Sequence, residues 1–205
     1  MALATYTDLQ SAVAGWLHRE DDDELLARVP DFVALGEARI FRVLRLRRML
    51  TTAMLATTSG AATVALPADF LHFHRLRLTA PDQAIDYLPG RSFSDQYPAS
   101  YAGAPRHYTV EGANLVLAPV PDSSTTIEAV YYARPAALAT TPSNWLLTEH
   151  PGLYLWSALA EAAPFLRDAA MVQAWEGKLA AELNDARTAD ALAARSGSGL
   201  RVRVR

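Results

Sequence analysis

Cysteine is absent from this sequence of 205 residues. Its absence excludes a disulfide scaffold, thiolate metal ligands and a cysteine nucleophile. No apolar run approaches the roughly 18 residues that a membrane span needs. Residues 1–9 contain no basic stretch followed by an apolar one, so we do not expect a secretory signal. Lysine is almost absent too, because 18 of the 19 basic residues are arginines.

The hydrophobic fraction of 51% is too high for a wholly disordered chain, and the length suits one domain or one domain that carries an insertion. The net charge of -3 is unevenly placed. Residues 195–205 hold four arginines and no acid, so the rest of the chain has a charge of -7. An acidic body disfavours a globular nucleic-acid binder, and a basic end is typical of a segment that docks onto a partner.

Both ends of the chain have the periodicity of helices. Thr7 is placed to cap a first helix, and a second helical stretch is expected to start near Glu24. Pro30 is placed to open a long helix at its first turn. We expect that long helix to carry five arginines in its later half: Arg39, Arg42, Arg45, Arg47 and Arg48. After Asn144 an apolar pattern with helical spacing returns, and a last helix is expected from Asp168 to about residue 194.

The middle of the chain alternates as strands do. Residues 51–56 and 62–66 flank Ser59-Gly60 and predict a hairpin, and residues 107–110 and 115–118 predict a clearer one. Further strands are expected at residues 73–79 and 127–132, with a short helix or loop at 89–97. No internal repeat is seen.

The predicted fold class is therefore α+β. The N- and C-terminal helices would form a helical core, with a mostly antiparallel β insertion and an extended basic C-terminal tail. We divide the chain into N-terminal core helices at 1–50, a β-rich insertion at 51–135, C-terminal core helices at 136–194 and a flexible tail at 195–205.

The sequence contains no catalytic motif, and we expect neither an enzyme nor a cofactor. It has no phosphate-binding or dinucleotide-binding glycine loop, no H-E-x-x-H and no G-x-S-x-G on a strand-to-helix turn. His72 and His74 could share a metal on one strand face, but no third ligand is evident. The acids from Glu20 to Glu24 lack the spacing of a calcium loop and are better interpreted as a solvated connection.

The five arginines at the end of the long helix have three interpretations. They could contact nucleic-acid phosphates, pair with acids of another subunit, or form a solvated face that complements the helix dipole. Because the body is acidic, we favour contacts with a subunit or with a partner protein.

The last six residues, Leu200, Arg201, Val202, Arg203, Val204 and Arg205, alternate apolar and basic side chains. They could be a disordered end, but the alternation suits a strand added to another protein's sheet or a strap along a groove, and we favour docking. Tyr97 and Tyr101 lie in a loop-like stretch and are candidate anchors for a partner.

The order of short motifs along the chain resembles the head-to-tail adaptor (head-completion or connector) proteins of short-tailed double-stranded-DNA bacteriophages. The resembling segments span nearly the whole chain in order: Tyr6-Thr7-Asp8-Leu9, residues 30–40, residues 66–71, Pro105-Arg106-His107-Tyr108, residues 115–119, Tyr131-Tyr132-Ala133, Asn144-Trp145-Leu146-Leu147, residues 150–154 and residues 158–166.

The resemblance implies a structural virion protein. Such adaptors form a ring, usually of twelve copies, beneath the portal protein. Their C-terminal segments grip the portal, their lower face receives the tail or nozzle protein, and double-stranded DNA passes through the lumen without sequence-specific binding. By this resemblance residues 200–205 would bind the portal, the five arginines would contact a neighbouring subunit or the portal, and Tyr97 and Tyr101 would contact the tail protein. The alternative is a nucleic-acid-binding regulatory module that uses the arginines and the tail.

Overall fold

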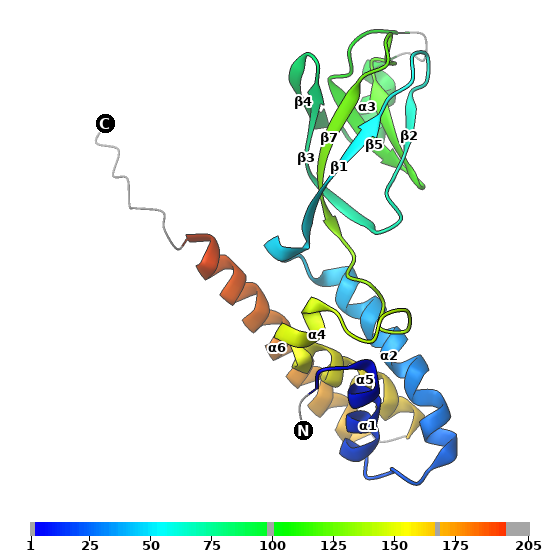
Figure 1. Cartoon of the computed structure of the whole chain (residues 1–205), viewed down its shortest axis with the longest axis vertical. Coiled ribbons are helices and arrows are strands. Elements are labelled where there is room, and N and C mark those ends of the chain that lie inside the picture. The colour runs from blue at the N-terminus through cyan, green and yellow to red at the C-terminus, as the bar shows by residue number, and fades with distance from the viewer. Residues whose placement is uncertain (1–2, 98–100, 167–168, 196–205) are drawn as a thin grey trace, which may run out of the picture. The chain divides into compact units, whose positions relative to one another are not determined.

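The structure is a computed structural model that describes residues 3–97, 101–166 and 169–195 (Figure 1). It confirms the α+β class, with helices and a mixed sheet. The chain divides into two compact units. The helical unit comprises Met1–Arg47 and Pro135–Arg205, and the β unit comprises Arg48–Arg134.

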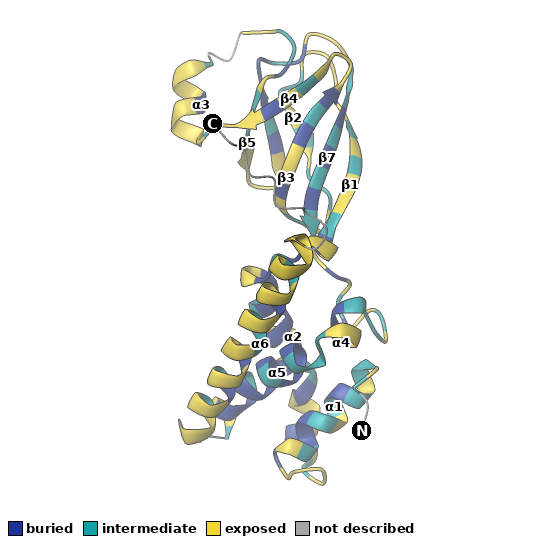
Figure 2. Cartoon of the chain, turned by 90° about the vertical axis from the view of Figure 1, so that its left-hand side faces the viewer, coloured by how far each residue is buried: buried dark blue, intermediate teal, exposed yellow. Residues whose placement is uncertain are grey.

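The helical unit is built around α5, which contacts α1, α2, α4 and α6. Most residues of α5 are buried, whereas the long α6 exposes most of its outer surface (Figure 2). The bounds of its helices are α1 Tyr6–Trp16, α2 Asp23–Val43, α4 Trp145–Glu149, α5 Pro151–Phe165 and α6 Ala169–Arg195.

The first helix begins earlier than Thr7 predicts. Thr5 is the N-cap, and its hydroxyl accepts the backbone N–H of Asp8 while the Asp8 carboxylate accepts that of Thr5. This reciprocal pair satisfies two donors that a helix start leaves open, which a single Thr7 cap would not do.

The helical stretch predicted near Glu24 and the long helix predicted from Pro30 are one helix, α2, because Asp22 caps it and Pro30 lies inside it. The Asp22 carboxylate accepts the N–H of Leu25. This bond is the main reason that the pKa of Asp22 is lowered, and the hydrogen bond from Arg19 is the second reason. Pro30 removes one backbone donor, but the helix continues because apolar residues on both sides of it, such as Val29 and Val33, are buried in the core.

The end of α2 corrects the placement of the arginines. Helix α2 stops at Val43, so of the five only Arg39 and Arg42 lie on it. Leu44 is extended, with φ -86° and ψ 130°, and both it and Leu46 are buried. Burial of these two leucines in an extended segment explains why the helical pattern breaks off before the last three arginines. Arg47–Met49 then forms a short 3-10 helix.

The side chain of Asn144 makes three hydrogen bonds where the chain re-enters the helical unit. Its Oδ1 accepts the N–H of Leu147 and caps α4, and its Nδ2 donates to the Tyr154 hydroxyl and to the carbonyl of Ala136. Upstream, the buried Glu37 accepts the N–H of Leu138 with its Oε1 at 3.1 Å. The return segment is thereby bound to α2 at one point and to α5 at another.

The β unit is a seven-stranded sheet in the order β1-β7-β3-β4-β5-β6-β2. All its pairings are antiparallel except the short parallel contact between β4 and β5. The bounds are β1 Leu50–Ala56, β2 Thr63–Ala65, β3 Phe70–Thr79, β4 Asp82–Tyr87, α3 Gly90–Gln96, β5 His107–Glu111, β6 Asn114–Ala118 and β7 Thr126–Ala133.

The predicted hairpin around Ser59-Gly60 is wrong. Strand β1 pairs with β7, and β2 pairs with β6. The segment between them is held elsewhere, since the N–H of Thr57 bonds to the carbonyl of Thr125 and that of Gly60 to Pro121. Long-range strand partners therefore outcompete the local turn.

The other predicted hairpin is confirmed as β5–β6. Gly112 in its turn has φ +59°, a left-handed conformation that glycine adopts without strain. The predicted strands at 73–79 and 127–132 correspond to β3 and β7, and the short-helix alternative at 89–97 corresponds to α3. Strand β4 has no counterpart among the predicted elements.

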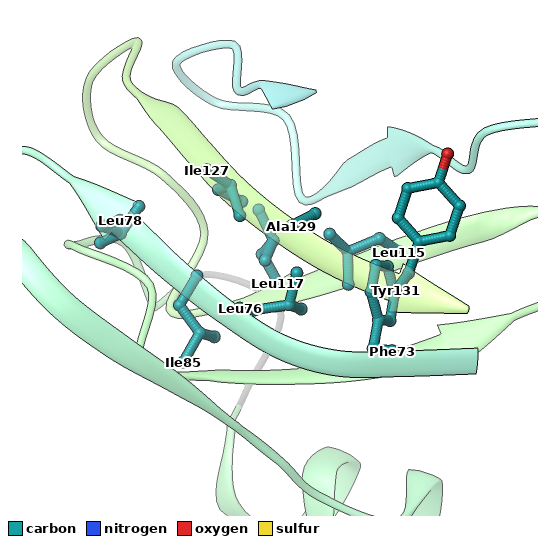
Figure 3. Packing of buried hydrophobic residues seen from close by; sticks show 9 residues of the cluster. All are labelled: Phe73, Leu76, Leu78, Ile85, Leu115, Leu117, Ile127, Ala129 and Tyr131. Carbon is teal, nitrogen blue, oxygen red and sulfur yellow. The ribbon is translucent and has the colours of Figure 1, made fainter. Parts of the chain in front are cut away.

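The core of the β unit is formed by side chains from β3, β4, β6 and β7 (Figure 3). They are Phe73, Leu76, Leu78, Ile85, Leu115, Leu117, Ile127, Ala129 and Tyr131. Only Tyr131 contributes a polar side-chain atom, and its hydroxyl donates to Asp69 Oδ1 at 2.9 Å. Removal of these groups from water is the main driving force for this unit to fold.

Tyr131 is expected to make stability fall at alkaline pH. Burial and, to a lesser extent, the hydrogen bond to Asp69 raise the pKa of Tyr131 from 10.0 to about 12. The folded state holds the proton of the Tyr131 hydroxyl more tightly than the unfolded state does. The contribution of Tyr131 to the free energy of unfolding is therefore complete below pH 10 and is lost as the pH rises through 12. Urea unfolding between pH 8 and pH 12 should show this decline, and Tyr131→Phe should make it shallower. Parallel declines in the two proteins would contradict the assignment.

Candidate assembly surfaces

Arg39, the first of the five predicted arginines, pairs with acids of its own chain. Its guanidinium donates to both carboxylate oxygens of Glu176, with Nη1 2.6 Å from Oε1, and lies 3.5 Å from Glu161. The bond to Glu176 is the main reason that the pKa of Arg39 is raised. Helices α2, α5 and α6 are thus joined by one charged group, a role typical of arginine because its planar fork binds carboxylates in two places.

Arg45 and Arg47 are also used within the chain. Nη1 of Arg45 donates to the carbonyls of Phe41 and Leu44 at 2.7 and 2.6 Å, and Nε of Arg47 lies 3.2 Å from Asp190. From α6, Arg187 donates to the carbonyl of Val43 at 2.7 Å. Arg45 and Arg187 thus satisfy carbonyls that the end of α2 leaves open, and their charges complement its dipole.

Arg42 differs from its neighbours, because it is exposed and, over the described part of the chain, has no side-chain partner. Arg48 is exposed as well and belongs to the β unit. Of the five predicted contact residues, Arg42 is therefore the best placed to reach another molecule.

Tyr97 and Tyr101, the two candidate anchors for a partner, are in contact with each other. Tyr97 directly follows α3, and its ring stacks on that of Tyr101 with centroids 6.1 Å apart. Its hydroxyl and Nδ1 of His107 form a hydrogen bond of 2.6 Å. Tyr101 is 57% exposed. The bond to His107 of β5 thus fixes the Tyr97 ring, whereas the Tyr101 ring remains accessible to solvent.

The remaining candidates are distributed as follows. Residues 200–205 lie outside the described part of the chain. His72 and His74 are exposed, and His74 packs its ring edge on Tyr132 at 6.1 Å.

Within residues 3–97, 101–166 and 169–195, no group of three or more His, Asp or Glu side chains could hold a metal ion. None of the described helices is long and apolar enough to cross a membrane.

Comparison with protein families gives the context in which these surfaces act. The family model for the SU10 adaptor protein matches residues 4–203. The chain belongs to the SU10 adaptor family. No curated protein matches it. Membership makes the chain a bacteriophage head-to-tail adaptor and a structural component of the virion, and it fits the expectation of a non-enzymatic protein.

A tryptophan cluster in this adaptor was missed by the sequence patterns. Trp16 packs its edge on Trp156 and Trp175 at 5.1 and 5.7 Å, and the latter two are stacked at 5.5 Å. Lys178 Nζ lies 4.9 Å from the centre of the Trp156 ring. Trp16 is still 47% exposed. The three rings come from α1, α5 and α6, so no local spacing could have indicated the cluster.

The adaptor's sheet also has one unprotected edge. The outer strand β1 contains no charge, proline or glycine, and its Met54 is 63% exposed. The opposite outer strand, β2, is only three residues long. Edge strands of proteins that act alone are usually short, charged or covered. The bare edge of β1 therefore agrees with a protein that works within an assembly.

Proposed function

We propose that this adaptor forms a ring of twelve copies between the portal and the tail or nozzle protein of a short-tailed double-stranded-DNA phage. In this ring, residues 200–205 bind the portal, Arg42 and Arg48 contact a neighbouring copy or the portal, and the surface of Tyr97 and Tyr101 faces the tail side. The genome passes through the lumen without sequence-specific contacts.

The family match over residues 4–203 is the observation that carries this proposal. The outer edge of β1 and the exposed Arg42 support it, because each offers a contact that the residues described in the structure do not satisfy. Contacts between copies in a ring are heterologous, so one face of each copy must complement a different face of the next.

The arrangement of the arginines disfavours the alternative of a nucleic-acid-binding module. Arg39 and Arg47 are neutralised by Glu176 and Asp190, and Arg45 is bound to backbone carbonyls. Guanidinium groups that are already paired would have to break these bonds before they could neutralise phosphates. The purified chain is therefore expected to bind duplex DNA weakly and without a steep salt dependence.

The portal contact is tested by mixing the purified chain with portal rings and imaging the mixture by electron microscopy. We expect rings of adaptor on one end of the portal. A chain that lacks residues 196–205 should remain folded, as judged by circular dichroism, and should no longer bind, because several tails acting together provide most of the affinity. Undiminished binding by the shortened chain would reject the portal role of residues 200–205.

Arg42→Glu in the same mixture tests the lateral contact. If Arg42 faces acids of a neighbouring copy, the variant should bind portals as incomplete or irregular rings. Arg91→Glu, another exposed arginine in this chain, is the matched control and should leave the rings complete. Complete rings with both variants would contradict the role of Arg42.

A further inference from the structure

The outer face of α2 is exposed and carries an apolar side chain at its centre. Helices α2 and α6 both pack on α5, which lies between them (Figure 1, Figure 2). The buried residues of α2 face the core, and Leu35, Ala38 and Arg42 follow one another at helical spacing on the opposite side, where all three are exposed. Leu35 is 52% exposed. This face therefore offers a projecting leucine and, two turns further on, the cation that has no side-chain partner among the described residues.

The outer face of α6 has room for a large side chain and ends in an acid. Gly177, Ala181 and Asp185 follow one another at steps of four, so they form one row along the helix, and all three are exposed. A Cβ atom added to Gly177 would meet no neighbouring atom within 4 Å. Asp185 makes no ion pair within the described residues. The row is thus open at Gly177 and negatively charged at its far end.

Helices α2 and α6 run in the same direction. Arg39 bonds to Glu176, and the carbonyl of Val43, further along α2, accepts a bond from Arg187, further along α6. The copies of a ring all have the same orientation relative to its axis. A contact between α2 of one copy and α6 of the next would therefore bring the two helices together in parallel.

The two faces match in spacing and in charge when the helices are parallel. Leu35 and Arg42 are seven residues apart, which is about 10.5 Å along a helix, and Gly177 and Asp185 are eight apart, which is about 12 Å. With Leu35 over Gly177, Arg42 therefore reaches the level of Asp185. In the antiparallel direction Arg42 would lie at the level of Ala170, which offers no charge.

We propose that α2 of one copy packs in parallel on α6 of the next copy in the ring, with Leu35 against Gly177 and Arg42 paired with Asp185. The inference rests on the proposed function and names the acid that Arg42 meets there. Because α2 and α6 lie on two sides of α5, the contact is heterologous and leaves each copy one face for a further copy, as closure of a ring requires. The leucine supplies apolar contact, and the ion pair fixes the register of the two helices.

Disulfide cross-linking tests this contact directly, because the chain has no cysteine of its own. The variant with Leu35→Cys and Gly177→Cys is assembled on portal rings, oxidised and separated on a non-reducing gel. We expect a ladder of cross-linked adaptors that extends beyond the dimer, since each copy joins two neighbours. A disulfide forms only between residues whose Cα atoms lie within about 7 Å. Leu35→Cys with Ala191→Cys is the matched control and should give no ladder, because Ala191 is also exposed but lies about 21 Å further along α6.

An exchange of charges tests the ion pair. Asp185→Arg alone should give incomplete or irregular rings on the portal, as expected for Arg42→Glu. The double variant Arg42→Glu with Asp185→Arg should restore complete rings, because the two charges have changed places. Arg42→Glu with Asp95→Arg is the matched control, since Asp95 is an exposed acid of the β unit, and it should restore nothing.

Three outcomes would overturn the contact while the proposed function stands. The first is complete rings on the portal without a ladder from the cysteines at positions 35 and 177. The second is an exchange of charges that restores no rings, and the third is cross-linked dimers from Leu35→Cys alone, which would indicate a two-fold contact between two α2 helices. If the unaltered chain forms no rings on the portal, the proposed function itself is rejected, and this contact with it.

Discussion

Gly36→Leu is expected to lower the free energy of unfolding by about 3 kcal/mol, the upper end of the usual cost of overpacking a core. Gly36 lies where α2 crosses α5. A Cβ atom added there would lie 2.5 Å from Oγ of Ser157 and 3.1 Å from the backbone nitrogen of Ala158. Ser157 is itself buried and donates to the carbonyl of Tyr154, so it cannot turn away without losing that bond.

Urea unfolding followed by circular dichroism measures this effect. Gly177→Ala is the control, because Gly177 is a helical glycine with open space around its Cβ position. It should stabilise the chain by roughly 0.5–1 kcal/mol, the usual difference between alanine and glycine inside a helix. If Gly36→Leu were as harmless as Gly177→Ala, helices α2 and α5 could not pack as closely as the structure has them.

Arg39→Glu is expected to lower the free energy of unfolding by about 2 kcal/mol, more than an exposed ion pair contributes. The variant would place a third carboxylate beside Glu161 and Glu176, and the guanidinium that joins α2 to α5 and α6 would be lost. The side chain of Arg39 is 32% exposed, so solvent screens part of the repulsion. The difference from the wild-type chain should shrink in 1 M salt.

Arg42→Glu is the matched control for stability, since it lies on the same helix, is exposed and has no side-chain partner over the described residues. Its effect should stay within about 0.5 kcal/mol. The double variant Arg39→Glu with Glu176→Arg should recover part of the lost stability. If the two single variants unfold at the same urea concentration, the Arg39 pairings contribute nothing to the fold.

The two hairpin predictions show what a local pattern can determine. The turn at Glu111-Gly112-Ala113-Asn114 joins strands that are partners in the sheet, and the left-handed Gly112 needs no tertiary support. The turn at Ser59-Gly60 is also indicated by the sequence and also contains a glycine with positive φ, yet its flanking strands pair with β7 and β6 instead. A turn sequence predicts that the chain reverses direction there, but it does not predict which strands will pair.

The arginines show the same limit for charges. Their number near the end of α2 is visible in the sequence, but the acid that binds Arg39 is 137 residues away. The acidic body of the sequence favoured partners on another subunit. The structure places Glu176 and Asp190 of α6 there, and of the five arginines it leaves Arg42 exposed without a side-chain partner among the described residues.

By itself the sequence determined the class of the fold, the β5–β6 hairpin, the return of helix after Asn144 and the resemblance to phage adaptors. Each of these depends on residues close together in the chain or on the order of motifs along it. Only the tertiary structure decided the strand order, the partners of the arginines and the tryptophan cluster. Each of these depends on surfaces from distant segments that compete for the same contacts, and packing decides that competition.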